Sequence, residues 1–230
     1  MSDARRTRNM MTVHVIVNEH NSVYNRFLAE LRDKEIQRDS MRFRRNLERA
    51  GEITAYEISK TFDYAPADVV TPIGVAEAMV PDERVVVASV LRAGLPFHQG
   101  FLNCFDGAES AFVAARRHYM ENHRDFEIRY DSVYTPSLKG KLLLLVDPML
   151  ATGASVVTAY RELLGRGGRP RRAHIAAVLA SERGLEHVAK ELEDEPVTLW
   201  VGAVDKGLTP SAYIAPGMGD AGDLAFGEKI

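Results

Sequence analysis

The chain has 230 residues, of which 46% are hydrophobic and 27% charged, and its formal net charge is −3. This composition is typical of a soluble globular protein with a substantial core, and the small negative charge gives no general attraction for nucleic acid or for a membrane surface. The single cysteine, Cys104, excludes an intrachain disulfide and a cysteine metal cluster, and no apolar run is long enough to span a bilayer.

The N-terminus differs in character from the rest of the chain. Residues 1–11 are basic and no apolar segment follows them, so they predict a flexible tail rather than a secretory signal. We expect residues 12–230 to form one domain in a cytoplasmic protein, with no nucleic-acid or membrane partner. Cys104 lies beside Phe101 and Phe105 and is expected to be buried.

Hydrophobic periodicity predicts alternating strands and helices along this domain. The expected elements are first a strand over 12–17, helices over 21–32 and 39–50, a hairpin or excursion over 59–74, a strand over 85–90 and a helix over 96–105. They continue with a strand over 110–114, an added hairpin over 126–134, strands over 142–146, 174–180 and 197–201, and helices over 155–164 and 181–192. Buried strands that alternate with helices indicate an α/β fold with a parallel sheet covered on both faces.

The most distinctive segment is LLLLVDPMLATGAS at 142–155, in which an apolar strand ends in Asp147 and a short loop leads into a helix. Backbone N–H groups and the helix dipole attract an anion at such a helix start, and the acid is placed to bind sugar hydroxyls beside it. The segment contains neither a Walker A sequence nor GxGxxG, which disfavours an ATP or dinucleotide site at this loop. The segment therefore predicts a phosphorylated sugar as ligand.

Arginines follow two other predicted strands. Arg92 belongs to LRAG after strand 85–90, and Arg116 and Arg117 follow strand 110–114. The carboxyl ends of parallel strands meet at one edge of a sheet, and two arginine side chains there suit a pyrophosphate or a second anionic group. Successive strand residues face opposite sides, so only one of Arg116 and Arg117 is expected to point into the site, and the choice stays open.

A glycine-rich segment, YIAPGMGDAGD at 213–223, lies near the C-terminus. Glycine allows the backbone to approach a ligand closely and to adopt positive φ. Main-chain N–H and C=O groups of this segment are therefore suited to reading a flat heterocycle.

Three segments together, LRAG at 91–94, VDPMLATGAS at 146–155 and YIAPGMGDAGD at 213–223, resemble the uracil phosphoribosyltransferase family. The resemblance implies a type I phosphoribosyltransferase-like parallel sheet flanked by helices, with a small hood or hairpin. It also implies UMP salvage: uracil and 5-phosphoribosyl-1-pyrophosphate (PRPP) give UMP and pyrophosphate. Mg²⁺ would be bound mainly through PRPP, without a metal site made by protein side chains alone. A homo-oligomer is expected, as a dimer or higher, and GTP is a candidate effector.

The resemblance also assigns roles to residues. Arg92, Asp147 and Asp220 would be catalytic, with Asp147 facing the ribose hydroxyls. The residues expected to bind PRPP are Arg92, Arg117, Asp147, Pro148, Met149, Leu150, Ala151, Thr152, Gly153, Ala154, Ser155 and Asp220. Those expected to bind uracil are Ile214, Gly219, Asp220 and Ala221.

The chain departs from the family's usual pattern in three places. Ala115-Arg116-Arg117 replaces a segment that normally resembles MYR, Ala154 replaces a second glycine, and Leu224 replaces a common basic residue. These differences concern efficiency, and Ala154 fits its loop only at negative φ. Residues 121–139 could form a hood over the site or an inert surface hairpin.

Two other functions remain open. One is a regulatory protein that senses UMP or PRPP on the same fold. The other is a phosphoribosyltransferase for another base, such as hypoxanthine or orotate. Those enzymes usually place two acids at the PRPP loop, whereas here Pro148 follows Asp147.

Overall fold

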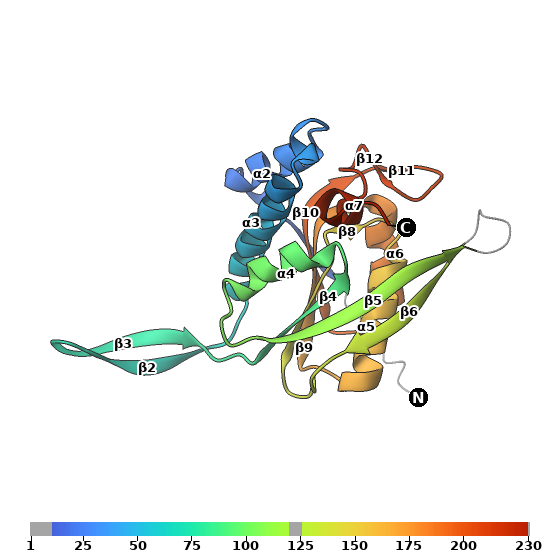
Figure 1. The fold of residues 1–230 in the computed structure, drawn as a ribbon. Coiled ribbons are helices and arrows are strands. Elements are labelled where there is room, and N and C mark those ends of the chain that lie inside the picture. The colour runs from blue at the N-terminus through green and yellow to red at the C-terminus, as the bar shows by residue number, and fades with distance from the viewer. Residues whose placement is uncertain (1–10, 120–125, 230) are drawn as a thin grey trace, which may run out of the picture.

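A computed structural model describes residues 11–119 and 126–229, with the backbone alone for 115–119 and 126–131. Its centre is a sheet with the strand order β1-β10-β9-β7-β4-β5-β6, and a short strand β8 also pairs with β9. Neighbours along this order are parallel, apart from the antiparallel pair β5 and β6 (Figure 1). The strands of this sheet are β1 (Thr12–Val15), β4 (Val85–Leu91), β5 (Glu109–Tyr119), β6 (Phe126–Tyr134), β7 (Leu142–Val146), β8 (Met149–Leu150), β9 (Arg172–Ser181) and β10 (Val197–Asp205).

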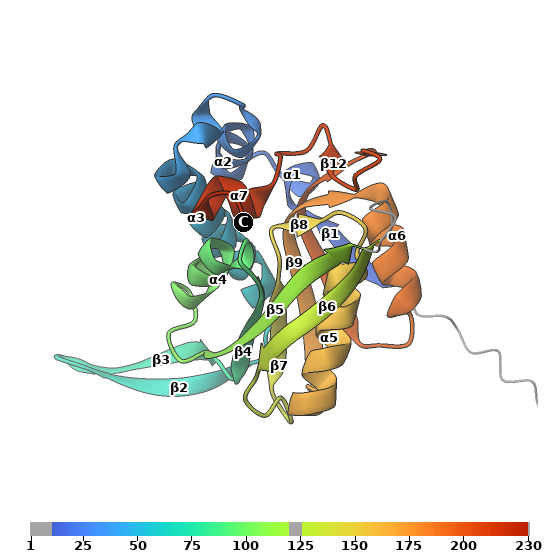
Figure 2. The ribbon, with the colours of Figure 1, turned by 45° about the vertical axis from the view of Figure 1, so that its right-hand side comes forward.

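Helices cover both faces of the sheet, as the α/β prediction requires (Figure 2). On one face, α2 (Val23–Arg32), α3 (Ser40–Ser59) and α4 (Gly94–Leu102) share an apolar core with alternate strand residues such as Val87 and Leu144. On the other, α5 (Ala154–Gly167) and α6 (Glu182–Glu191) pack with the intervening ones, such as Val86 and Leu143. The expected parallel sheet flanked by helices is confirmed.

The remaining elements are short. They are α1 (Ile16–Glu19), the 3-10 helix η1 (Ile36–Arg38), β11 (Gly207–Leu208), β12 (Ile214–Ala215) and α7 (Ala221–Phe226). β11 and β12 form a small antiparallel sheet that leads into α7. None of the described helices combines the length and the apolar character of a bilayer-spanning segment.

Two hairpins extend from the body (Figures 1 and 2). β2 (Tyr64–Thr71) and β3 (Gly74–Pro81) form the first, so the hairpin alternative at 59–74 is correct but the hairpin continues to Pro81. The second is β5–β6. The expected strand 110–114 is too short, because antiparallel pairing with β6 prolongs β5 to Tyr119. Arg116 and Arg117 therefore lie within a strand rather than after one.

Other boundaries also differ from the predictions. The predicted helix 39–50 begins as expected after Asp39, whose side chain accepts a hydrogen bond from Arg42 N, but it continues to Ser59 because buried residues such as Ala55 and Ile58 extend its apolar face. Cys104 is exposed, contrary to expectation, since α4 ends before it at Leu102. The predicted tail, up to residue 10, and residues 121–125 of the predicted hood lie outside the described residues.

Candidate active site

The turn that contains LRAG lies beside the end of β7. A Cβ atom on Gly94 would lie 3.1 Å from Ser89 Cβ and 3.3 Å from the carbonyl oxygen of Val146, the last residue of that strand. The peptide bond between Leu91 and Arg92 is cis. LRAG and the loop that starts at Asp147 are thus neighbours at the carboxyl edge of the sheet, where ligands of open α/β folds bind.

Asp147 follows β7 and is almost fully buried. Its Oδ1 accepts a hydrogen bond from Met149 N at 3.2 Å. Burial raises the pKa of this carboxyl to about 7, and the Met149 N–H lowers it only in part. A carboxylate held in so dry a position gains strongly from new hydrogen-bond donors, and sugar hydroxyls are donors of this kind.

The start of α6 packs against the loop after Asp147 and is hydrogen-bonded to it. The Oγ atom of Ser181 donates a hydrogen bond to Ala151 O at 2.5 Å and accepts one from Gly184 N at 2.9 Å. A Cβ on Gly184 would lie 2.5 Å from the carbonyl oxygens of both Leu150 and Ala151. Sequence reasoning gave Ser181 and Gly184 no role, although a serine between a strand and a helix is a recognisable N-cap.

The loop ends in a left-handed turn that opens α5. Gly153 has φ of +76°, and a Cβ there would lie 2.8 Å from both Gly184 O and Val188 Cγ2, so glycine is required. Ala154 begins α5 with right-handed backbone, which accommodates its methyl group. Thr152 Oγ1 accepts a hydrogen bond from Ala154 N at 3.4 Å. The amides of the first turn and the helix dipole, with the Thr152 hydroxyl beside them, form a setting suited to phosphate.

Arg92 connects LRAG to the C-terminal segment. Its Nη2 lies 2.9 Å from Asp223 Oδ1, and its Nη1 donates a hydrogen bond to Gly227 O at 3.2 Å. Asp223 N in turn donates to Asp220 Oδ1 at 3.0 Å, so Asp220 caps α7. Asp223 was not singled out from the sequence, because nothing local indicates a partner that is 131 residues away.

The predicted uracil-binding residues lie in the turn before α7 and at its start. Ile214 is in β12 and is buried, the Ala215–Pro216 peptide bond is cis, and Gly219 has φ of +84°. Ala221 is the first residue of α7 and is also buried. This turn reaches Arg92 through Asp223, so all three segments quoted from the sequence meet at one edge of the sheet.

The other predicted PRPP-binding residues divide into two groups. Pro148, Met149, Leu150 and Ser155 belong to the same loop and to the first turn of α5, and Met149 and Leu150 form β8. Arg117 lies in β5, where it pairs with Ile128 of β6. Its side chain lies outside the described part of the structure, so its role and the choice between Arg116 and Arg117 stay predictions.

Comparison with known proteins places the chain in a family. Residues 17–228 match the family model described as "Uracil phosphoribosyltransferase". The chain is 48% identical over 212 residues to the "Uracil phosphoribosyltransferase" of Porphyromonas gingivalis, covering 92% of this chain and 96% of that protein. It is 35% identical over 206 residues to the "Uracil phosphoribosyltransferase" of Pyrococcus furiosus, covering 88% and 85%.

A fold comparison finds a solved structure that is similar over nearly the whole chain. A solved structure of a protein from Aquifex aeolicus has a TM-score of 0.83 to this chain at 27% identity, covering 95% of this chain and all of that one. The sheet order, the strand-end loops and the match over nearly the whole chain point to one assignment: the chain belongs to the uracil phosphoribosyltransferase family and has the type I phosphoribosyltransferase fold.

Proposed function

We propose that the chain transfers the 5-phosphoribosyl group of PRPP to uracil, forming UMP and pyrophosphate, as a pentosyltransferase of UMP salvage in the cytoplasm. One observation carries this proposal: Arg92, bonded to Asp223, joins the LRAG turn beside Asp147 to the glycine-rich C-terminal segment. The reaction needs neighbouring positions for a pyrophosphate, a phosphorylated ribose and a flat base. The LRAG turn suits the pyrophosphate, the loop after Asp147 suits the phosphorylated ribose, and the glycine-rich C-terminal segment suits the base.

PRPP would be held by the loop from Asp147 to Ser155. The 5′-phosphate suits the amides at the start of α5, and the ribose hydroxyls suit the Asp147 carboxylate, while Asp220 approaches from the side of the base. Arg92 and Arg117 would grip the pyrophosphate. Transfer through an oxocarbenium-like transition state then needs alignment of the base with the anomeric carbon and positive charge near the leaving group, more than covalent help from the protein.

Uracil would be read by main-chain groups of Ile214 and of residues 219–221. Its O4, N3–H and O2 present acceptor, donor and acceptor, which a backbone that offers donor, acceptor and donor satisfies completely. Cytosine would set its amino group against a donor and leave buried polar groups unpaired. In a closed site such a mismatch costs about 1–3 kcal/mol for each unpaired group.

Mg²⁺ is expected to enter with PRPP. Within the described residues, no three side chains of His, Cys, Asp or Glu are grouped so that they could hold a metal ion. The carboxylates of Asp147 and Asp220 are oxygen donors of the kind that Mg²⁺ accepts, and this ion usually keeps phosphate and water ligands. The residues therefore fit a metal bound mainly through PRPP, where it would offset the charge of the pyrophosphate.

The β2–β3 hairpin supports a homo-oligomer, as a dimer or higher. It carries solvent-exposed apolar side chains, with Ile73 98% and Val70 84% exposed. Exposed apolar surface on a projecting arm is unusual for a monomer and suits contact with another copy of the chain. A single domain over residues 12–230 and GTP as an effector also remain our predictions.

UMP formation from uracil and PRPP with magnesium tests the proposal. Cytosine, hypoxanthine and orotate serve as competing bases, and Asp147→Asn serves as the control variant. We expect turnover of uracil alone and its loss in the variant. Turnover of another base instead would contradict the proposed specificity. Tight binding of UMP or PRPP without turnover of any base would favour a sensor over an enzyme.

A further inference from the structure

An ion pair next to the turn between Ile214 and Gly219, which is proposed to bind uracil, joins the N-terminal and C-terminal parts of the chain. Arg32 is the last residue of α2, and Asp205 is the last residue of β10. Arg32 Nη1 donates to Asp205 Oδ2 at 2.7 Å, and Arg32 Nη2 donates to Asp205 Oδ1 at 2.9 Å. Their side chains are only 25% and 9% exposed. Two parallel bonds between a guanidinium and a carboxylate fix both distance and orientation, which one charge contact does not.

The same two side chains also hold Gly217 by both of its backbone polar atoms. Asp205 Oδ2 accepts a hydrogen bond from Gly217 N at 2.9 Å, and Arg32 Nη1 donates one to Gly217 O at 3.1 Å. The N–H belongs to the peptide plane before Gly217 and the carbonyl to the plane after it. Fixing both groups therefore fixes the direction of the chain on either side of this residue.

Gly217 is the point at which the turn folds back on itself. Its φ is +63°, and a Cβ there would lie only 2.0 Å from the carbonyl oxygen of Ile214. Ile214 and Met218 on either side of it are buried in the core, but no side chain fits at Gly217 itself. The peptide planes at Gly217 are therefore held by the hydrogen bonds from Arg32 and Asp205 rather than by a side chain of their own.

We propose that Arg32 and Asp205 are positioning residues for the base, because they set the backbone of the turn that connects Ile214 to Gly219. They touch neither substrate. They keep the amides and carbonyls on both sides of Gly217 in the arrangement that pairs with uracil. This inference rests on the proposed function, since it assigns the shape of the same base-binding segment to residues outside it.

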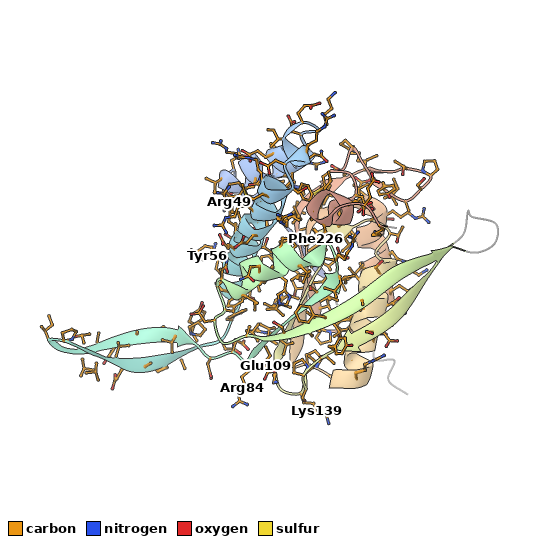
Figure 3. The ribbon with its side chains drawn as sticks, viewed as in Figure 1. Arg49, Tyr56, Arg84, Glu109, Lys139 and Phe226 are labelled. Atoms are coloured by element: carbon orange, nitrogen blue, oxygen red, sulfur yellow. The ribbon has the colours of Figure 1, made fainter. Side chains whose placement is uncertain are left out.

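An ion pair that served only to connect α2 to β10 would not require hydrogen bonds to Gly217. The bidentate contact alone would tie α2 to β10, and the distant pair Arg169 and Glu195 makes such a contact, with distances of 2.9 and 3.2 Å. Arg169 follows Gly168, where a Cβ would lie 3.0 Å from Lys139 Cε. Figure 3 shows Lys139 at the end of the sheet opposite Phe226 of α7. Arg169→Met is therefore a control that removes a bidentate ion pair far from the base-binding turn, at a more exposed site.

Three substitutions remove the contacts in steps. Asp205→Asn keeps one oxygen for Gly217 N but turns an amino group toward Arg32 and removes the negative charge. Arg32→Lys keeps the positive charge, but one ammonium group cannot reproduce the planar fork. Arg32→Met keeps the apolar stem and removes every bond.

The kinetic constants for the two substrates test the proposal. We expect KM for uracil to rise about tenfold or more in Arg32→Met and less in Arg32→Lys and Asp205→Asn, with KM for PRPP within about twofold of the parent. Discrimination of uracil against cytosine should weaken in the same order, and Arg169→Met should change neither KM.

Several results would overturn the inference. Equal increases of both KM values, or a lower melting temperature with unchanged kinetics, would reduce the pair to a structural contact. If Arg32→Met does not fold, Asp205→Asn and Arg32→Lys decide the question by the same ratio of KM values. A parent chain that forms no UMP would instead refute the proposed function, which is a separate outcome.

Discussion

Replacing Asp147 by asparagine should remove activity and yet stabilise the unliganded protein at neutral and alkaline pH. Burial raises the pKa of its carboxyl from 3.8 to about 7, whereas the same group in the unfolded chain is in water and keeps its usual pKa. The folded protein must therefore hold a poorly solvated negative charge above pH 7. Asparagine keeps the shape and the oxygen that accepts from Met149 N, and it carries no charge.

The difference in pKa sets the size of the effect. At 1.36 kcal/mol per pKa unit, the rise from 3.8 to about 7 corresponds to about 4 kcal/mol of lost stability once both states are ionised. Because the folded pKa is the higher one, this loss is small below pH ~4, grows as the pH rises toward 7, and is then constant. Between pH ~5 and ~8 the relative stability of Asp147→Asn should grow by about 2–3 kcal/mol, or about 5–10 °C in Tm.

Thermal unfolding of the ligand-free parent and variant at these two pH values measures this change. The free energy of burying the asparagine amide does not depend on pH. The change in the Tm difference between the two pH values therefore measures the effect of the carboxylate charge. Asp205→Asn is the control: burial acts to raise the pKa of Asp205, but Arg32 and the Gly217 N–H outweigh it and the pKa lies below its usual value. The Asp205→Asn substitution should therefore lower Tm by the same amount at both pH values. A difference in Tm between Asp147→Asn and the parent that does not change with pH would refute the reasoning.

Three further variants probe the rest of the site. Arg92→Met should raise KM for PRPP about tenfold or more, because the guanidinium proposed to bind pyrophosphate is lost. Gly153→Ala should destabilise the protein by about 1–3 kcal/mol and weaken PRPP binding, while Gly140→Ala, at similar φ in open space, should cost about 1 kcal/mol and leave PRPP binding unchanged. Ser181→Ala should raise KM for PRPP severalfold because the loop loses a donor, whereas Ser22→Ala, which removes another N-cap, should only lower stability by about 1 kcal/mol.

Steady-state kinetics and urea unfolding check these outcomes. An unchanged KM for PRPP in Arg92→Met would exclude the proposed pyrophosphate contact. Equal kinetic effects of Gly153→Ala and Gly140→Ala would show that the fit of the loop against α6 is unimportant. If Ser181→Ala and Ser22→Ala differ in neither stability nor kinetics, the hydrogen bond to Ala151 O does not position the loop.

Much of the fold was predictable because it depends on local periodicity. The five residues of β7 are continuously apolar, which is typical of a strand buried on both faces, and its boundaries were predicted correctly. Alternation of such strands with amphipathic helices limited the topology to a parallel sheet. The positions of Arg92 and Asp147 at one edge followed from the same rule, without any knowledge of distances.

Element ends were predicted less well when a partner distant in sequence decided them. β5 continues to Tyr119 because β6 pairs with it, and α3 continues to Ser59 because Ala55 and Ile58 pack into the buried core. Cys104 lies outside the core because α4 ends two residues earlier. For β5 and α3, hydrogen bonding or packing with another segment outweighed the local preference.

The sequence by itself determined the α/β fold, the phosphate-binding character of the loop after Asp147 and the family, because these depend on residue types at short spacings. Only the tertiary structure decided which groups support the site: Ser181 beneath the loop, Asp223 against Arg92, and Arg32 with Asp205 around Gly217. These contacts join residues 12 to 185 positions apart. A hydrogen bond depends on distance and direction in space, and a linear sequence specifies neither until the chain has folded.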